Sequence, residues 1–165
     1  MTQVTDRIEK KVMLAAPLAR VWRALTEAQQ FGAWFGVEFE GDFVAGRPLA
    51  GKMIPTQVDA EVAKSQEPYA GLEFVILVER IEPMRLFSFK WNPYEIEPGL
   101  DPLCEPMTLV TFMLEEAAGG TMLTITESGF DGVPLEKRAQ AFASNEQGWT
   151  IQCRLIEKYL TSAQS

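Results

Sequence analysis

Histidine is absent from this chain of 165 residues. Its absence excludes every site that needs an imidazole: the Ser-His-Asp triad, Cys-His proteolysis, His-ligated zinc and the iron site of two His and one carboxylate. Cysteine is nearly absent, since Cys104 and Cys153 are too few for a disulfide framework and make a poor zinc site without histidine. We therefore expect no metal and no other cofactor.

Basic residues are also few. The 15 Lys and Arg stand against 23 Asp and Glu, which gives a formal net charge of −8. An acidic surface repels phosphate backbones and anionic lipid, so we expect no nucleic acid and no membrane as a partner. Long apolar runs are missing too: none reaches the roughly 18 residues of a membrane span, and residues 1–10 lack the apolar core of a signal peptide. These absences predict a cytoplasmic location.

What the chain does contain is ordinary for a globular protein, with 47% hydrophobic and 23% charged residues. The length predicts a single domain over residues 1–165. A chain of this size buries roughly 70% of its unfolded surface, so it folds without disulfides or metal.

Hydrophobic periodicity predicts the elements in order. Ile8, Lys10, Val12 and Leu14 form a mostly apolar face that alternates with Arg7, Glu9, Lys11 and Met13, which predicts a strand. Two short helices follow, one beginning near Pro17 and one over residues 29–35. Six further strands are then predicted, over residues 37–43, 52–58, 72–81, 85–91, 107–115 and 121–129, with loops over residues 59–70 and 92–106. A run of strands with segregated helices predicts an α+β fold with an antiparallel sheet.

The last predicted element is a helix of about seven turns from Pro134 to Leu160. Its apolar row has three- and four-residue spacing: Leu135, Ala139, Phe142, Glu146, Trp149, Cys153, Ile156 and Leu160. A carboxylate, Glu146, interrupts that row. Gly148 is a second irregularity, because glycine costs about 1 kcal/mol relative to alanine in mid-helix. Either marks a break or a place of close packing.

Two carboxylates fall on apolar faces and are candidates for a site. Glu127 is in register with Thr121, Leu123 and Ile125, and Glu146 lies in the helical row. Each is interpreted as a polar anchor for a ligand, as a structural ion pair with a base such as Arg80, Arg85 or Arg154, or as a rim residue that reaches water.

A curved sheet that wraps a long helix leaves a space between the two, and such a space is a common ligand cavity. Large rings from several strands face that space. The residues predicted to line it and bind a ligand are Trp34, Phe43, Val75, Leu77, Phe87, Phe89, Trp91, Leu109, Glu127, Phe130, Glu146 and Trp149.

Several segments, in this order along nearly the whole chain, resemble one superfamily. They are Ile8-Glu-Lys-Lys-Val-Met-Leu-Ala-Ala-Pro17, Val21-Trp22-Arg-Ala-Leu25-Thr26, Trp34-Phe35-Gly36, Val78-Glu79-Arg80-Ile81-Glu82-Pro83, Phe89-Lys90-Trp91, Thr126-Glu127-Ser128-Gly129-Phe130 and Asn145-Glu-Gln-Gly148-Trp149. Together they resemble the START-like (SRPBCC) superfamily, and within it the homologues of the activator of the heat-shock protein 90 ATPase. The resemblance implies a helix-grip fold, in which a curved antiparallel sheet of six to seven strands wraps a long C-terminal helix.

The resemblance implies three functions, and the residues leave all three open. The first is the binding of a small apolar or aromatic molecule, such as a lipid, in the cavity. The second is a chaperone partner, contacted through the outer sheet face or residues 92–106. The third is a cyclase or hydrolase that uses Glu127, Glu146 and Tyr69 or Tyr94. The chain is a monomer or a homodimer; an edge strand or the aromatic cluster near Trp34 would offer an interface.

Overall fold

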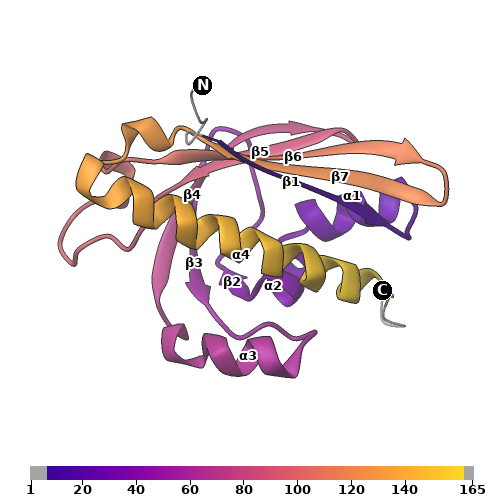
Figure 1. Cartoon of the computed structure of the whole chain (residues 1–165), viewed down its shortest axis with the longest axis horizontal. Helices are drawn as coiled ribbons and strands as arrows, with labels where there is room; N and C mark the ends of the chain where they lie inside the picture. The colour runs from indigo at the N-terminus through magenta and orange to yellow at the C-terminus, as the bar shows by residue number, and fades with distance from the viewer. Residues whose placement is uncertain (1–6, 162–165) are drawn as a thin grey trace.

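The computed structural model describes residues 7–161 and shows one antiparallel sheet with a long helix laid across it (Figure 1). The seven strands lie in the order β1-β7-β6-β5-β4-β3-β2. They are β1 (Arg7–Leu14), β2 (Val37–Phe39), β3 (Pro48–Met53), β4 (Glu73–Glu82), β5 (Leu86–Trp91), β6 (Thr108–Ala117) and β7 (Gly120–Ser128). The predicted α+β class and helix-grip architecture are confirmed.

The helices gather on one face of the sheet, and α3 lies at the far edge beyond β3 (Figure 1). They are α1 (Leu18–Thr26), α2 (Ala28–Phe35), α3 (Ala60–Gln66) and α4 (Leu135–Thr161), with short 3₁₀ turns η1 (Glu67–Tyr69), η2 (Pro102–Cys104) and η3 (Phe130–Gly132). The two short helices after the first strand and the long C-terminal helix are as predicted. In the described part of the chain, no helix combines the length and apolar character needed to cross a membrane.

Local sequence explains where α1 and α2 begin and end. Pro17 is the N-cap residue of α1, where its missing N–H is not needed. Gly36 ends α2 with a φ of 95°, a left-handed conformation that glycine adopts without strain. A Cβ there would lie 2.7 Å from the Ile54 carbonyl oxygen, so the close approach of the next segment also requires glycine.

Two predicted strands have different bounds. The strand predicted over residues 37–43 ends at Phe39, and Phe43 instead lies buried in the connection to β3, packed against Phe31 and Phe87. The strand predicted over residues 52–58 is β3, shifted towards the N-terminus to Pro48–Met53. Its pairing with both β2 and β4 sets this register, which alternation alone does not reveal.

The prediction of a loop over residues 59–70 is wrong, because this segment forms α3 and η1. The Asp59 side chain caps α3 by accepting hydrogen bonds from the Glu61 and Val62 amides, both at 3.0 Å. The helix buries no residue, so it carries little apolar periodicity. The signal that was available is the cap followed by good helix formers.

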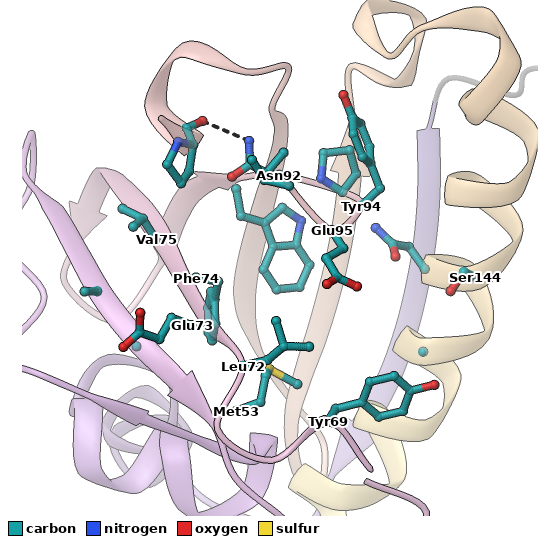
Figure 2. A pocket seen from close by; sticks show the side chains of 18 of the residues that line it. Met53, Tyr69, Leu72, Glu73, Phe74, Val75, Asn92, Tyr94, Glu95 and Ser144 are labelled. Atoms are coloured by element: carbon teal, nitrogen blue, oxygen red, sulfur yellow. Dashed lines mark hydrogen bonds between the residues drawn. The ribbon is translucent and has the colours of Figure 1, made fainter. Parts of the chain in front are cut away.

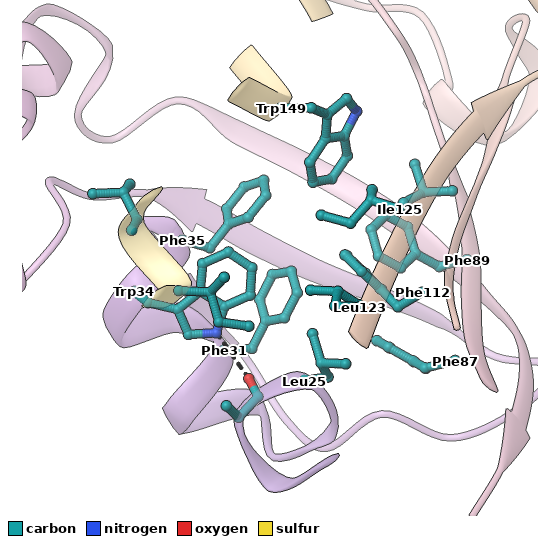
Figure 3. Close-up of a cluster of buried hydrophobic side chains, with 14 of the residues drawn as sticks. Leu25, Phe31, Trp34, Phe35, Phe87, Phe89, Phe112, Leu123, Ile125 and Trp149 are labelled. Carbon is teal, nitrogen blue, oxygen red and sulfur yellow. Dashed lines mark hydrogen bonds between the residues drawn. The ribbon is translucent and has the colours of Figure 1, made fainter. Parts of the chain in front are cut away.

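The core lies between the sheet and the helices α1, α2 and α4 (Figure 3). Phe31 of α2 contacts six other rings, those of Trp34, Phe35, Phe39, Phe43, Phe89 and Phe112. Trp34 is fully buried, and its Nε1 donates to the Ala24 carbonyl oxygen at 2.9 Å. The suggestion that this cluster offers a dimer surface is therefore wrong, because the fold buries it.

Candidate functional site

A buried carboxylate sits where β7 passes beneath α4. Glu127 is fully buried, and its strand neighbours are Ile8 of β1 and Val110 of β6. Along β7 it is in phase with Thr121, Leu123 and Ile125, which are all buried and alternate with half-buried residues. The predicted inward direction of Glu127 is confirmed.

Four side chains donate hydrogen bonds to this carboxylate. Trp91 Nε1 donates at 2.9 Å and Thr108 Oγ1 at 2.5 Å to one oxygen, and Trp149 Nε1 donates at 2.8 Å to the other. Asn145 Nδ2 lies 3.0 and 3.2 Å from the two oxygens. An indole N–H can only donate, so the carboxylate fixes the direction of both indoles.

The ion pair predicted for Glu127 is wrong, because these partners are neutral. Arg80 and Arg85 instead pair with Glu82, and Arg154 is exposed. The bases lie elsewhere because β7 pairs with β1 and β6, whereas Glu82 and its two arginines belong to the β4–β5 hairpin.

Glu146 does not join Glu127. Its carboxylate lies 2.9 Å from Lys10 Nζ and is about half exposed. Between Phe142 and Trp149, the apolar row of the helix can pass through either Asn145 or Glu146. Both routes consist of one three-residue and one four-residue step. In the structure Asn145 takes the inward position, which turns Glu146 about 100° away from Glu127. The two carboxylates thus do not meet in one site.

A pocket of about 930 Å³ lies next to this network (Figure 2). Its walls are the strands β3 and β4, the segment over residues 91–102, and the middle of α4. Exposed side chains at its edge, among them Tyr69, Leu72 and Leu100, leave it open to solvent. This volume is typical of small-molecule sites.

Three rings form the floor of the pocket. Trp91 and Trp149 stack with centroids 5.7 Å apart and an angle of 29°, and Phe35 lies 6.0 Å from each. The Trp91 and Trp149 indoles also donate to Glu127, which lies behind them and does not line the pocket. Glu127 therefore acts as a positioning residue for the floor.

Gly148 opens the helical wall of the pocket. A Cβ at this position would meet no atom within 4 Å, although the residue lies in mid-helix beside Trp149. Close packing, one of the two predictions for Gly148, is therefore wrong, and α4 continues unbroken through it. The glycine leaves space in the pocket that a side chain would fill.

One titratable lining residue shows a pKa shift. Burial, with the nearby charges of Glu105 and Glu136, raises the pKa of the Tyr94 hydroxyl above its ordinary value of 10.0. The hydroxyl therefore stays protonated at neutral pH. Within residues 7–161, no three Cys, Asp or Glu side chains gather as a metal site.

Comparison with known proteins identifies the family to which this fold and pocket belong. Residues 15–161 match the model of the family described as activator of Hsp90 ATPase homolog 1-like protein. The chain belongs to this AHSA1 family. No curated protein sequence matches it.

Solved structures share the fold of this AHSA1-family chain at low identity. A protein from Arthrobacter aurescens has a TM-score of 0.73 at 19% identity, over 98% of this chain and 90% of its own. MLL2253 from Mesorhizobium loti has a TM-score of 0.67 at 21% identity, over 93% and 96%. DynU16, from the dynemicin biosynthetic locus, has a TM-score of 0.60 at 24% identity, over 92% of this chain and 47% of its own.

The fold divides the predicted ligand-binding residues of this AHSA1-family chain into two groups. Val75, Trp91 and Trp149 line the pocket. The others do not: they are Trp34, Phe43, Phe87 and Phe89 in the core, Phe130 packed on Phe142, Leu77 and Leu109 on the outer sheet face, and Glu127 and Glu146 as described. Leu77 and Leu109 were placed in the wrong phase, since buried Ile76, Val78 and Val110 define the inner face.

Sequence reasoning missed several lining residues, chiefly Met53, Phe74, Asn145 and residues 93–100. The length and prolines of the 92–106 segment indicated a structured functional loop, which was the available signal. The sequence held no signal for Asn145, because its position fits the apolar row of the helix no better than the position of Glu146 does.

Proposed function

We propose that this AHSA1-family chain binds a small organic molecule with a flat apolar body, which lies on the aromatic floor formed by Phe35, Trp91 and Trp149. The observation that carries the proposal is that floor, which lines a pocket of about 930 Å³ although Phe35 and Trp149 are themselves largely buried. Flat rings gain from offset stacking and edge contacts in addition to burial of apolar surface. Lipids with a ring system belong to the same class. A cytoplasmic location stays a prediction from the sequence.

The local structure supports binding rather than simple packing. The Glu127 network holds both indoles by hydrogen bonds, so the floor is preformed. Gly148 leaves space above it despite the cost of glycine to a helix. Both features reduce the stability a closed core would have, and both are understandable if the space is used.

Isothermal titration with 2-naphthylmethanol, a neutral flat alcohol, tests the proposal. The purified chain should bind it with one site per molecule. Gly148→Leu should abolish binding because the new side chain fills the space above the floor. The same variant should be more stable by about 0.5–1 kcal/mol in urea, because leucine favours the helix.

Gln147→Leu is the matched control, since it adds the same side chain one position away, at an exposed residue that does not line the pocket. It should bind as the wild type does. No binding by the wild type, or undiminished binding by Gly148→Leu, contradicts the proposal.

A second candidate function rests on the family itself, whose description names an activator of the Hsp90 ATPase. In this function the chain contacts a chaperone through the outer sheet face or residues 92–106. The ATPase rate of the purified chaperone, measured with saturating amounts of this chain, tests it. An unchanged rate rejects it.

A further inference from the structure

The acidic and basic residues that line the pocket are all acidic. Four glutamates are among the lining residues, Glu40, Glu73, Glu95 and Glu97, and no Lys or Arg is. Among the described residues, none of the four carboxylates forms an ion pair. Figure 2 shows the Glu95 side chain extending into the pocket. The rim therefore carries more negative than positive charge, and the cations near it are Lys137 over the Tyr94 ring and Lys52 opposite Glu73 on the neighbouring strand.

The N–H donors of the lining are already occupied. Each side chain there that carries an N–H group donates within the protein: Trp91, Asn92, Asn145, Trp149 and Gln152. Gln152 adds a side-chain oxygen that is buried without a hydrogen-bond partner. A ligand thus meets acceptors and the hydroxyl groups of Tyr69, Tyr94 and Ser144 rather than free side-chain N–H donors, which favours a ligand that brings N–H donors itself.

One ring of the lining already holds a cation. Lys137 Nζ lies over the Tyr94 ring, 4.5 Å from its centroid. Such contacts arise because the face of an aromatic ring carries partial negative charge. The larger ring of Trp91, which is half-buried and lines the pocket, offers the same attraction from the floor.

We propose that the pocket selects an organic cation: a protonated amine attached to a flat apolar body. The body lies on the floor of Phe35, Trp91 and Trp149, and the ammonium group lies between the ring faces and the carboxylates of the rim. Anionic molecules of the same shape are rejected. This inference rests on the function proposed above and adds the charge of the ligand to it.

Three probes of one shape separate this inference from the proposed function. They are 2-naphthylmethylammonium, 2-naphthylmethanol and 2-naphthoate, titrated into the full chain at low ionic strength and at pH 7. The cation should bind about tenfold more tightly than the alcohol, and the carboxylate should bind more weakly than both. Because rim charges are screened by salt, the preference for the cation should shrink at 0.5 M NaCl.

The double variant Glu73→Gln with Glu95→Gln tests the source of the preference. It should reduce the ratio of cation to alcohol affinity severalfold. Its control is Glu115→Gln with Glu116→Gln, which changes the net charge equally at two exposed residues outside the pocket lining and should leave the ratio unchanged.

The outcomes are distinct. If the alcohol binds and the cation binds no better, or the carboxylate binds as well, the inference fails and the proposed function stands. A preference that survives in the Glu73 and Glu95 variant also overturns the inference, because the rim is then not its source. If none of the three probes binds, the proposed function fails and the inference fails with it.

Discussion

The molecule contains two aromatic regions that share strand β5 but differ in what covers them. In the closed region, Phe89 and Phe112 pack against Phe31 of α2, Phe87 packs against both of them, and all these rings are buried (Figure 3). In the open region, Trp91 at the end of the same strand stacks on Trp149 and faces the pocket. One strand therefore contributes rings to a sealed core and to the lining of a pocket.

The difference between the two regions comes from the helices above them. The closed region lies under α1 and α2, whose side chains fill the space. The open region lies under the middle of α4, where Gly148 has no side chain. Aromatic content therefore does not distinguish core from site, and neither does a hydrogen-bonded indole, since Trp34 in the core has one; the glycine above the rings does.

The largest effect should follow from a cavity in the closed region. Phe87→Ala removes a fully buried ring that contacts Phe43, Phe89 and Phe112. Urea denaturation should show a loss of about 3–5 kcal/mol, a large part of the stability of a typical domain. The folded fraction should still bind 2-naphthylmethanol, because Phe87 does not line the pocket. Loss of binding at equal folded fraction would mean that the two regions are not separate.

A smaller loss of unfolding free energy should follow from Glu127→Gln, because Glu127 lies behind Trp91 and Trp149 of the open region and accepts hydrogen bonds from both. Glutamine keeps one acceptor oxygen but turns an NH₂ group towards donors that the carboxylate satisfies. Because buried donors then lack acceptors, we expect a loss of about 2–3 kcal/mol in urea denaturation, together with weaker binding of 2-naphthylmethanol.

Glu146→Gln is the control for this change, since the same substitution at a half-exposed ion pair with Lys10 should cost about 0–1 kcal/mol and leave binding intact. Equal losses at both positions would show that the Glu127 network contributes no more than a surface pair.

The pair Glu127 and Glu146 also shows how far the sequence alone determines the site. Strand alternation has a period of two, so the inward direction of Glu127 follows from its neighbours. A helix has a period of 3.6, so Asn145 and Glu146 both fit a row of three- and four-residue steps. Only the packing of α4 on the sheet decides between them. The fold class was predictable, because it depends on the order of the elements. The pocket was not predictable, because it depends on how α4 is rotated about its own axis.

The same limit applies to Asp59 and α3, where a capped helix that buries nothing has no apolar pattern to find. Lys158 Nζ of α4 lies 2.8 Å from the Asp59 carboxylate and, with the capped amides, holds the pKa of Asp59 below its ordinary value of 3.8. A lowered pKa in the folded state stabilises the protein above pH 3.8, and this stabilisation is lost as the pH falls through the lower, folded pKa.

The smallest predicted effect therefore comes from Asp59→Asn, a change outside both aromatic regions. Asparagine is an equally good N-cap, so the variant removes the charge and keeps the cap. It should be slightly less stable than the wild type at pH 7 in urea denaturation, and the difference should vanish below the folded pKa, where the wild-type carboxyl is also neutral. Binding of 2-naphthylmethanol should not change at any pH at which the chain is folded, because Asp59 does not line the pocket. A difference in stability that persists at low pH would assign the effect to the cap rather than to the charge.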